Sequence, residues 1–319
     1  SATCLAGCHK KGEIAVTAGE YEFTSAYYSC ALVFADSEAR LLVQEELDEE
    51  DLKKEIEYYK HKIDKTDYTE WVKTKALDNI KTLANYKALC KEAGIELSED
   101  DLKLAQSNID YMWDSYGYSV LLQANGVSYD TFKQYYIDGY YTNKYFDYLY
   151  GEGGKEEIPA DQLSKQLTED YVLVNALNAS FAEANVDQIK ELREKFTEYE
   201  TALRNGSRTF EEIYVEYNEI KPEEHKHEAP AEGELAPQDY HATVWGDENT
   251  EYAYEHFDAA KSLKVGEVKI ITLEDEAGLI LVVKKDIAAD PYYLDNLDDS
   301  LRQDLRGDEF EENTKKLIK

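Results

Sequence analysis

The chain has 319 residues, enough for two domains with separate cores, and its 43% hydrophobic content excludes a disordered acidic tail. Its formal net charge of −33 repels nucleic acids and anionic membrane surfaces and favours basic, unfolded or secreted polypeptides as partners, although a well-solvated surface alone would also explain it. No run approaches the roughly 18 apolar residues of a membrane span.

The start of the chain carries a short lipoprotein-like motif. The sequence LAGC at residues 5–8, followed by HKK, resembles a bacterial lipobox, in which the cysteine carries lipid. The resemblance makes Cys8 the expected lipid anchor and residues 1–12 a signal-peptide remnant and linker. It implies an extracytoplasmic protein tethered to the outer face of the cell membrane, and the alternative is a chance match.

The first half is predicted to be helical after a short strand and turn at 13–21. Gly94 is expected to end one helix, while Ser98 and Ser128 are expected to cap the starts of two others. Glycines at 151–154 predict a hinge. The predicted helices cover 23–43, 45–65, 71–93, 99–116 and 129–149.

The helix expected at 45–65 rests on its apolar spacing. Its apolar residues lie four, three and four positions apart, which is the pattern of an amphipathic helix with a solvated outer face. These residues are Leu52, Ile56, Tyr59 and Ile63.

The second half of the chain is predicted to contain strands as well as helices. After a helix from Ile158 to about Glu169, it is expected to alternate strands and helices around a polar loop at 219–243. Thr209 is expected to cap the second helix after the first strand. The predicted order is strand 171–177, helix 186–205, a short helix from 210, the loop, helix 255–263, strands 268–273 and 278–283, and helix 290–319.

Three segments in this half resemble motifs of the parvulin family. NGSRTFEEI at 205–213 is similar to its "G-x-x-F-x-x-L-A" segment, and FDAAKSLKVGEV at 257–268 is similar to its "F-x-x-A-x-x-L-x-x-G-E-V-S" segment. GLILVV at 278–283 falls where that family ends its domain with "G-Y-H-I-I-K-V". The resemblance implies a small antiparallel sheet surrounded by helices.

The flanking segments resemble the helical chaperone part of SurA/PrsA-like foldases, through GIELSED at 94–100 and GVSY at 126–129. The expected fold is therefore α+β and mostly helical, with a C-terminal helix that packs back on the N-terminal part. The expected domains are the chaperone domain at 13–157, the parvulin-like domain at 158–287 and the returning helix at 288–319.

Parvulins use a polar cluster centred on two histidines around the twisted prolyl amide. The resemblance places Asn175 and Ile280 at those two positions, and neither side chain can change charge near neutral pH as histidine can. No catalytic residue is therefore assigned, and whether the chain is an enzyme stays open. The prolyl-binding cup implied by the family would be lined by Phe257, Tyr254 and Trp245.

The cysteines and the histidine-containing loop give little support for a disulfide or a metal site. Cys30 and Cys90 lie in apolar stretches that predict buried thiols, with a disulfide between them as the alternative. His225 and His227 flank Lys226 among carboxylates, a pattern that could hold zinc or nickel, but the surrounding prolines and charges predict a mobile loop. No metal and no cofactor is assigned.

The predicted function is an extracytoplasmic foldase or chaperone-like protein that binds unfolded or secreted polypeptides, with a parvulin-like domain that lacks isomerase activity. Two alternatives remain open: an active peptidyl-prolyl cis-trans isomerase, and a structural or adhesive surface lipoprotein. The oligomeric state stays open.

Overall fold

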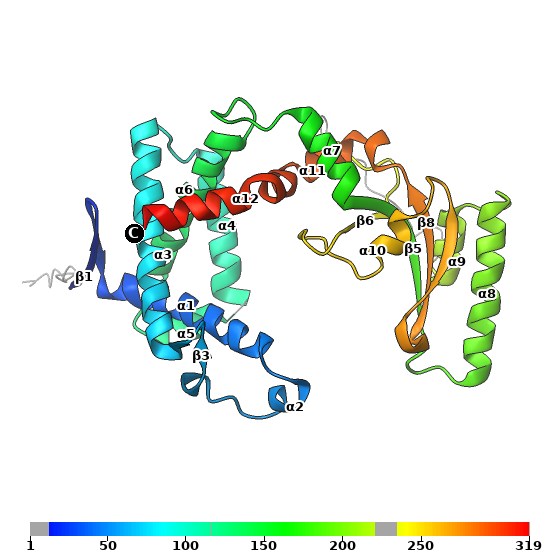
Figure 1. The fold of residues 1–319 in the computed structure, drawn as a ribbon, viewed down its shortest axis with the longest axis horizontal. Coiled ribbons are helices and arrows are strands. Elements are labelled where there is room, and N and C mark those ends of the chain that lie inside the picture. Colours follow the sequence, from blue (N-terminus) through cyan, green and yellow to red (C-terminus); the bar gives the residue numbers. More distant parts are fainter. Residues whose placement is uncertain (1–12, 116, 221–234, 319) are drawn as a thin grey trace, which may run out of the picture. The chain divides into compact units, whose positions relative to one another are not determined.

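The structure is a computed structural model that describes residues 13–115, 117–220 and 235–318 (Figure 1). The described chain divides into two compact units. Unit 1 contains residues 13–157 and 309–318, and unit 2 contains residues 158–308. The predicted α+β, mostly helical class is confirmed.

The elements follow one another in a mostly helical order. Those that begin in unit 1 are β1 (Ile14–Ala18), β2 (Tyr21–Thr24), α1 (Ser25–Glu45), α2 (Glu49–Leu52), η1 (Tyr58–Lys60), β3 (Lys62–Ile63), β4 (Thr66–Asp67), α3 (Tyr68–Ala93), α4 (Glu99–Ser115), α5 (Tyr118–Ala124) and α6 (Tyr129–Tyr150). Those that begin in unit 2 are α7 (Ala160–Asp170), β5 (Tyr171–Ser180), α8 (Val186–Arg204), α9 (Phe210–Tyr217), β6 (Ala242–Gly246), α10 (Phe257–Lys261), β7 (Val268–Thr272), η2 (Glu274–Glu276), β8 (Gly278–Lys285), η3 (Ile287–Ala289), α11 (Pro291–Asn296) and α12 (Asp298–Leu317).

The core of unit 1 is centred on α1 and α3, whose facing sides carry small residues. Ala31, Ala35 and Ala39 follow one another at helical spacing on α1 and are fully buried. They share one cluster with Ala76 and Ile80 of α3. Small side chains at this spacing let two helices pack closely along their length.

A second cluster joins another side of α1 to α4, α5 and α6. It contains Cys30 of α1, Trp113 of α4, Leu122 of α5 and Phe132 of α6. Cys30 and Cys90 are free and buried, as predicted, so the alternative of a disulfide between them is wrong. Burial raises the pKa of the Cys30 thiol to about 12 and that of Cys90 to about 11, which leaves both unreactive at neutral pH.

The predicted helix boundaries at capping residues are confirmed. Gly94 ends α3 in the left-handed conformation, with φ of 71°. The side chain of Ser98 accepts a hydrogen bond from Asp101 N, and Asp101 accepts one from Ser98 N in return. Ser128 caps α6 through Thr131 N, and Thr209 and Glu212 form a reciprocal capping box at α9.

The prediction of one helix over 45–65 is wrong. The side chain of Asp48 caps the short α2, and the chain then makes the β3–β4 turn through Asp64 and Lys65, both at positive φ. Ile56 and Ile63 still pack against the α1–α3 core, whereas Leu52 and Tyr59 are exposed, so the helical spacing of the four residues does not place them on one buried face.

Unit 2 is built on a four-stranded antiparallel sheet in the order β6-β5-β8-β7. The sequence does not predict strand β6, because its first two residues lie in the expected polar loop at 219–243. Figure 1 shows α8 and α9 on one side of these strands and α10 on the other. Alternation along β5 sends Leu177 and Ala179 toward α8 and α9, and Val172 and Val174 toward α10.

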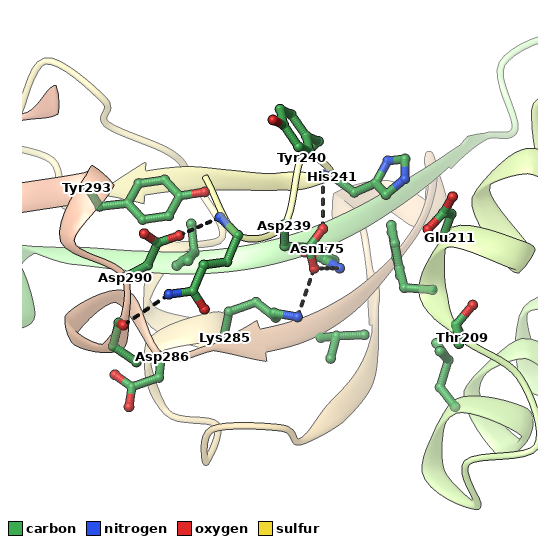
Figure 2. Close-up of a pocket in the computed structure, with 16 residues that line it drawn as sticks. Asn175, Thr209, Glu211, Asp239, Tyr240, His241, Lys285, Asp286, Asp290 and Tyr293 are labelled. Carbon is green, nitrogen blue, oxygen red and sulfur yellow. Dashed lines mark hydrogen bonds and ion pairs between the residues drawn. The ribbon is translucent and has the colours of Figure 1, made fainter. Parts of the chain in front are cut away.

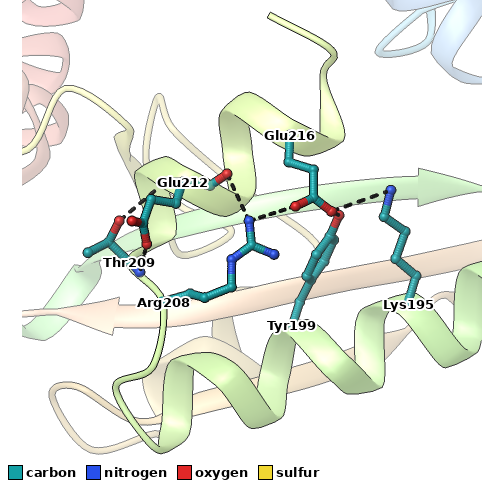
Figure 3. Close-up of polar contacts among 6 residues, drawn as sticks. All are labelled: Lys195, Tyr199, Arg208, Thr209, Glu212 and Glu216. Atoms are coloured by element: carbon teal, nitrogen blue, oxygen red, sulfur yellow. Dashed lines mark hydrogen bonds and ion pairs between the residues drawn. The ribbon is translucent and has the colours of Figure 1, made fainter. Parts of the chain in front are cut away.

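Helices α8 and α9 are joined by a polar cluster around Glu216 (Figure 3). Its carboxylate accepts hydrogen bonds from Tyr199 at 2.8 Å and from Arg208 at 2.7 Å, and Lys195 lies 3.9 Å away. These hydrogen bonds, with the charge of Arg208, lower the pKa of Glu216. The cluster fixes α9, whose first turn lines a pocket described below.

The predicted C-terminal helix is interrupted at Leu297, between α11 and α12. The end of α12 belongs to unit 1, where the ring of Phe310 lies 5.1 Å from that of Tyr86 and 5.2 Å from that of Phe146. Asn85 also donates to the carbonyl oxygen of Leu317 at 3.0 Å. These contacts confirm that the C-terminal helix packs back on the N-terminal part.

Candidate functional site

The three residues predicted to line the cup lie together on the α10 face of the sheet in unit 2. The rings of Trp245 and Tyr254 stack with 4.3 Å between their centroids, and Phe257 belongs to the same cluster. Trp245 is 4% exposed, Phe257 9% and Ile280, also in this cluster, 2%. These side chains pack against one another, and of the three predicted residues Tyr254 alone is partly exposed.

A half-open hollow of about 540 Å³ lies outside this cluster and is called here the Tyr254 groove. Tyr254 and Phe257 contribute its aromatic wall. Four acidic residues surround that wall: Asp247, Glu248, Glu255 and Asp258. An aromatic wall with acidic neighbours suits a polypeptide segment that combines apolar and basic side chains.

His256 is the histidine nearest to this groove. Its ring lies 5.7 Å from that of Tyr254, and its Nε2 lies 2.9 Å from the Glu255 carboxylate. Although this distance is short, Nε2 makes no well-directed hydrogen bond within the described chain. The other two histidines that the structure describes lie elsewhere: His241 packs on Tyr214 of α9, and His61 belongs to unit 1.

The two positions aligned with the family histidines do not meet in the structure. Asn175 of β5 pairs with Val283 of β8 and faces α9, whereas Ile280 pairs with Asn178 and faces α10. Ala176, the next residue along β5, shares the α10 face with Ile280. Asn175 and Ile280 therefore cannot act on one ligand.

Asn175 instead lines a separate pocket of about 660 Å³ on the α9 face, called here the Asn175 pocket (Figure 2). Strands β5 and β8 form its floor. The first turn of α9, the segment before β6 and the η3–α11 region form its walls. Figure 2 shows Asp239 beside Asn175 and Lys285, with His241 and Tyr240 above them and Tyr293 to one side.

Asp239 is the centre of the polar network in this pocket. Its Oδ2 accepts hydrogen bonds from Asn175 Nδ2 at 2.9 Å and from Lys285 Nζ at 2.8 Å, and its Oδ1 accepts one from His241 N at 3.0 Å. Burial by itself would raise the pKa of Asp239, but these donors and the charge of Lys285 outweigh burial and lower it. Asp239 is therefore ionised at neutral pH.

Sequence reasoning missed Asp239, Lys285 and His241 as pocket residues. Asp239 lies in a polar segment and Lys285 follows an apolar strand, and each arrangement is common on solvated surfaces. Only the pairing of β5 with both β6 and β8 brings these residues together. No local sequence signal marks that pairing.

Several predicted features lie outside the described residues. These include the expected lipid anchor Cys8 and the considered metal ligands His225 and His227. Within the described part of the chain, no group of three or more histidine, cysteine or carboxylate side chains is arranged to hold a metal ion. No described helix has the length and apolar character needed to cross a membrane.

Comparisons with solved structures give a loose likeness to a bacterial foldase. The chain is similar to the solved structure of the foldase protein PrsA from Streptococcus pneumoniae, at 14% identity and a TM-score of 0.41, over 75% of this chain and 79% of that chain. A likeness of this size does not show that the chain belongs to that family. No protein-family model matches the sequence. No curated protein matches it at a significant level.

Proposed function

We propose that the chain is an extracytoplasmic polypeptide-binding protein of the foldase and chaperone type, whose parvulin-like domain binds clients without isomerising them. In this proposal residues 13–157 form the chaperone domain and 158–287 the parvulin-like domain. Cys8 would carry the lipid that tethers the protein outside the cell membrane. The clients are unfolded or secreted polypeptides with basic segments.

The observation that carries the proposal is the composition of the α10 face. Ile280, Trp245 and Phe257 are buried in one cluster, which in this proposal closes the cup, and the nearby His256 has no second described histidine beside it. Parvulin catalysis as implied by the family needs two imidazoles beside a cup that is open to proline. An α10 face without that pair, where Tyr254 is the one predicted cup residue left partly exposed, supports binding at Tyr254 rather than catalysis.

The Tyr254 groove supports the choice of client. Its acidic residues give it a negative field beside an aromatic wall, and the whole chain has 68 acidic against 35 basic residues. Such a field accelerates the encounter with basic segments and keeps the complex soluble, while a half-open groove lets the client leave.

The proposal is tested on the full chain with two assays. We expect it to slow the aggregation of a chemically unfolded basic client, and to leave the cis-trans rate of a prolyl peptide at the uncatalysed value. A known active parvulin is the positive control for the second assay. A rate well above background would favour the isomerase alternative, and failure to slow aggregation would favour the structural or adhesive alternative.

A charge variant tests the groove itself. Glu248→Gln combined with Asp258→Asn removes two exposed charges at the groove, and we expect weaker client binding with an unchanged unfolding transition. The matched control, Glu92→Gln with Glu96→Gln, removes the same charge from exposed positions in unit 1. Equal loss of binding in both variants would mean that net charge, rather than the groove, recruits the client.

A further inference from the structure

The Asn175 pocket lies on the face of the sheet opposite the Tyr254 groove, and the proposed function does not use it. The first turn of α9, strands β5 and β8 and the segment before β6 enclose it. All of the described residues that line the pocket belong to unit 2.

The side-chain amide of Asn175 leaves one acceptor unused in this pocket. Asn175 is 2% exposed, and its Nδ2 donates to Asp239. The reverse orientation would set the amide oxygen against an ionised carboxylate, so the amide orientation is fixed by repulsion. Oδ1 is buried and finds no hydrogen-bond partner among the residues that the structure describes. Buried acceptors are rarely left in this state, so a ligand that donates a hydrogen bond fits the site.

The charge of the side chains that line the pocket favours a positively charged ligand. Four carboxylates line the pocket against the single ammonium group of Lys285. That ammonium group is already paired with Asp239 at 2.8 Å, so the remaining field is negative. The carboxylates belong to Glu211, Asp239, Asp286 and Asp290.

The aromatic side chains that line the pocket favour a planar guanidinium group over a compact ammonium group. The rings of Phe210, Tyr240, His241 and Tyr293 line the same pocket. A guanidinium group stacks on such rings and donates hydrogen bonds in its own plane, whereas an ammonium group is a compact, strongly hydrated charge. Leu173 and Val283 add apolar surface for the aliphatic stem of a long basic side chain.

We propose that the Asn175 pocket binds an arginine side chain of a polypeptide, with the guanidinium group donating to Oδ1 of Asn175. The acidic lining supplies the charge complement, and the surrounding rings bind the flat face. This site is separate from the Tyr254 groove, and its existence does not depend on whether the protein suppresses aggregation.

The probe is a short peptide, N-acetyl-Gly-Arg-Gly-amide, titrated into the full chain by calorimetry. The comparison peptide carries citrulline in place of arginine, which keeps the shape and removes the charge. A lysine peptide tests the preference for a planar cation. We expect one bound arginine peptide per chain, weaker binding of the lysine peptide and no measurable binding of the citrulline peptide.

Asn175→Ala removes the acceptor, and we expect it to weaken arginine-peptide binding about tenfold or more, since a hydrogen bond to a charged donor is lost. Glu211→Gln with Asp286→Asn changes only exposed positions of the lining and should weaken binding even if Asn175→Ala fails to fold. The control that removes the same charge is Glu92→Gln with Glu96→Gln. In the wild-type protein, the side-chain amide resonances of Asn175 should shift as the arginine peptide is added.

Each contrary result counts against the site. Absence of arginine-peptide binding at millimolar concentration, or equal affinity for the citrulline peptide, would overturn it. So would an equal loss of affinity in the control and in the Glu211/Asp286 variant, because general attraction to an acidic protein would then explain the binding. None of these outcomes bears on the aggregation and isomerase assays of the proposed function.

Discussion

Lys285 and Asp239 form an ion pair on the floor of the Asn175 pocket, with 2.8 Å between Nζ and Oδ2. Lys285 extends from the end of β8 and Asp239 from the segment that leads into β6, on opposite sides of β5. The pair therefore ties the edge strand β6 to the centre of the sheet, and Asn175 lies between the two residues along the sheet.

Lys285→Met should lower the free energy of unfolding by about 1 kcal/mol at neutral pH, because both side chains are partly exposed. The pKa of Asp239 is lowered in the folded protein, so its ionised form contributes stability above the ordinary carboxyl pKa near 4. That contribution is lost as the pH falls. The difference between variant and wild type should therefore shrink below about pH 4, as measured by urea unfolding. Lys269→Met, at an exposed position on β7, is the control.

Asp170 shows the opposite behaviour. Burial, followed by repulsion from Asp247 and Asp304, raises its pKa, so the folded protein binds this proton more tightly than the unfolded chain does. Its ionisation therefore lowers stability as the pH rises above about 4.

Asp170→Asn should raise the free energy of unfolding at neutral pH by about 0.5 kcal/mol and give no gain at pH 3. Gln166, which donates to Asp170, can still donate to the new amide oxygen. Urea unfolding of both proteins across pH 3 to 7 checks this. A variant less stable than wild type at pH 7 would show that the Gln166 hydrogen bond outweighs the repulsion.

Asp138 is the buried charge of unit 1, with a 2% exposed surface. It accepts hydrogen bonds from Tyr27 at 3.0 Å, Lys87 at 2.7 Å and Gln134 at 2.9 Å, and so joins α1, α3 and α6. Asp138→Ala should destabilise the protein by about 1 to 3 kcal/mol, because it leaves the buried hydroxyl group of Tyr27 without its acceptor, whereas the partly exposed Lys87 can be solvated. Asp100→Ala, which breaks an exposed pair with Lys103, should change the unfolding midpoint little. Similar effects of the two changes would contradict a structural role for Asp138.

The packing of the C-terminal segment within unit 1 can be tested by a substitution at Phe310. Phe310→Ala removes a ring that lies against Tyr86, Phe146 and Tyr150, and we expect a loss of about 2 to 4 kcal/mol. Leu317→Ala, at an exposed position of the same helix, should cost far less. Amide exchange should be faster in α3 and α6 of the Phe310 variant, whereas unchanged exchange would rule out the contact.

The helical part of the fold could be predicted because its signals are local. Gly94, Ser98 and Thr209 cap helix ends through residues at most four positions away, so the sequence around them is sufficient. The segment 45–65 shows the limit of this reasoning. Its apolar spacing suits a helix, but the burial of Ile63 depends on a core formed by distant helices.

The sheet and the site were harder to predict because they depend on distant pairings. Strand β6 is five residues long, follows a polar segment and pairs with β5 about seventy residues earlier. Which face Asn175 occupies follows from strand alternation and register. A shift of one residue in an alignment moves a side chain to the other face, as the separation of Asn175 from Ile280 illustrates.

The split of unit 1 between residues 13–157 and 309–318 has a consequence for biosynthesis. Unit 2 is one continuous stretch and can fold as soon as it emerges, whereas the rings of Tyr86 and Phe146 must wait for Phe310, which is made after unit 2. Synthesis of unit 1 thus begins before that of unit 2 but is completed after it. A premature stop just before Phe310 would leave a finished sheet domain attached to an unfinished helical one, a clear target for quality-control proteases.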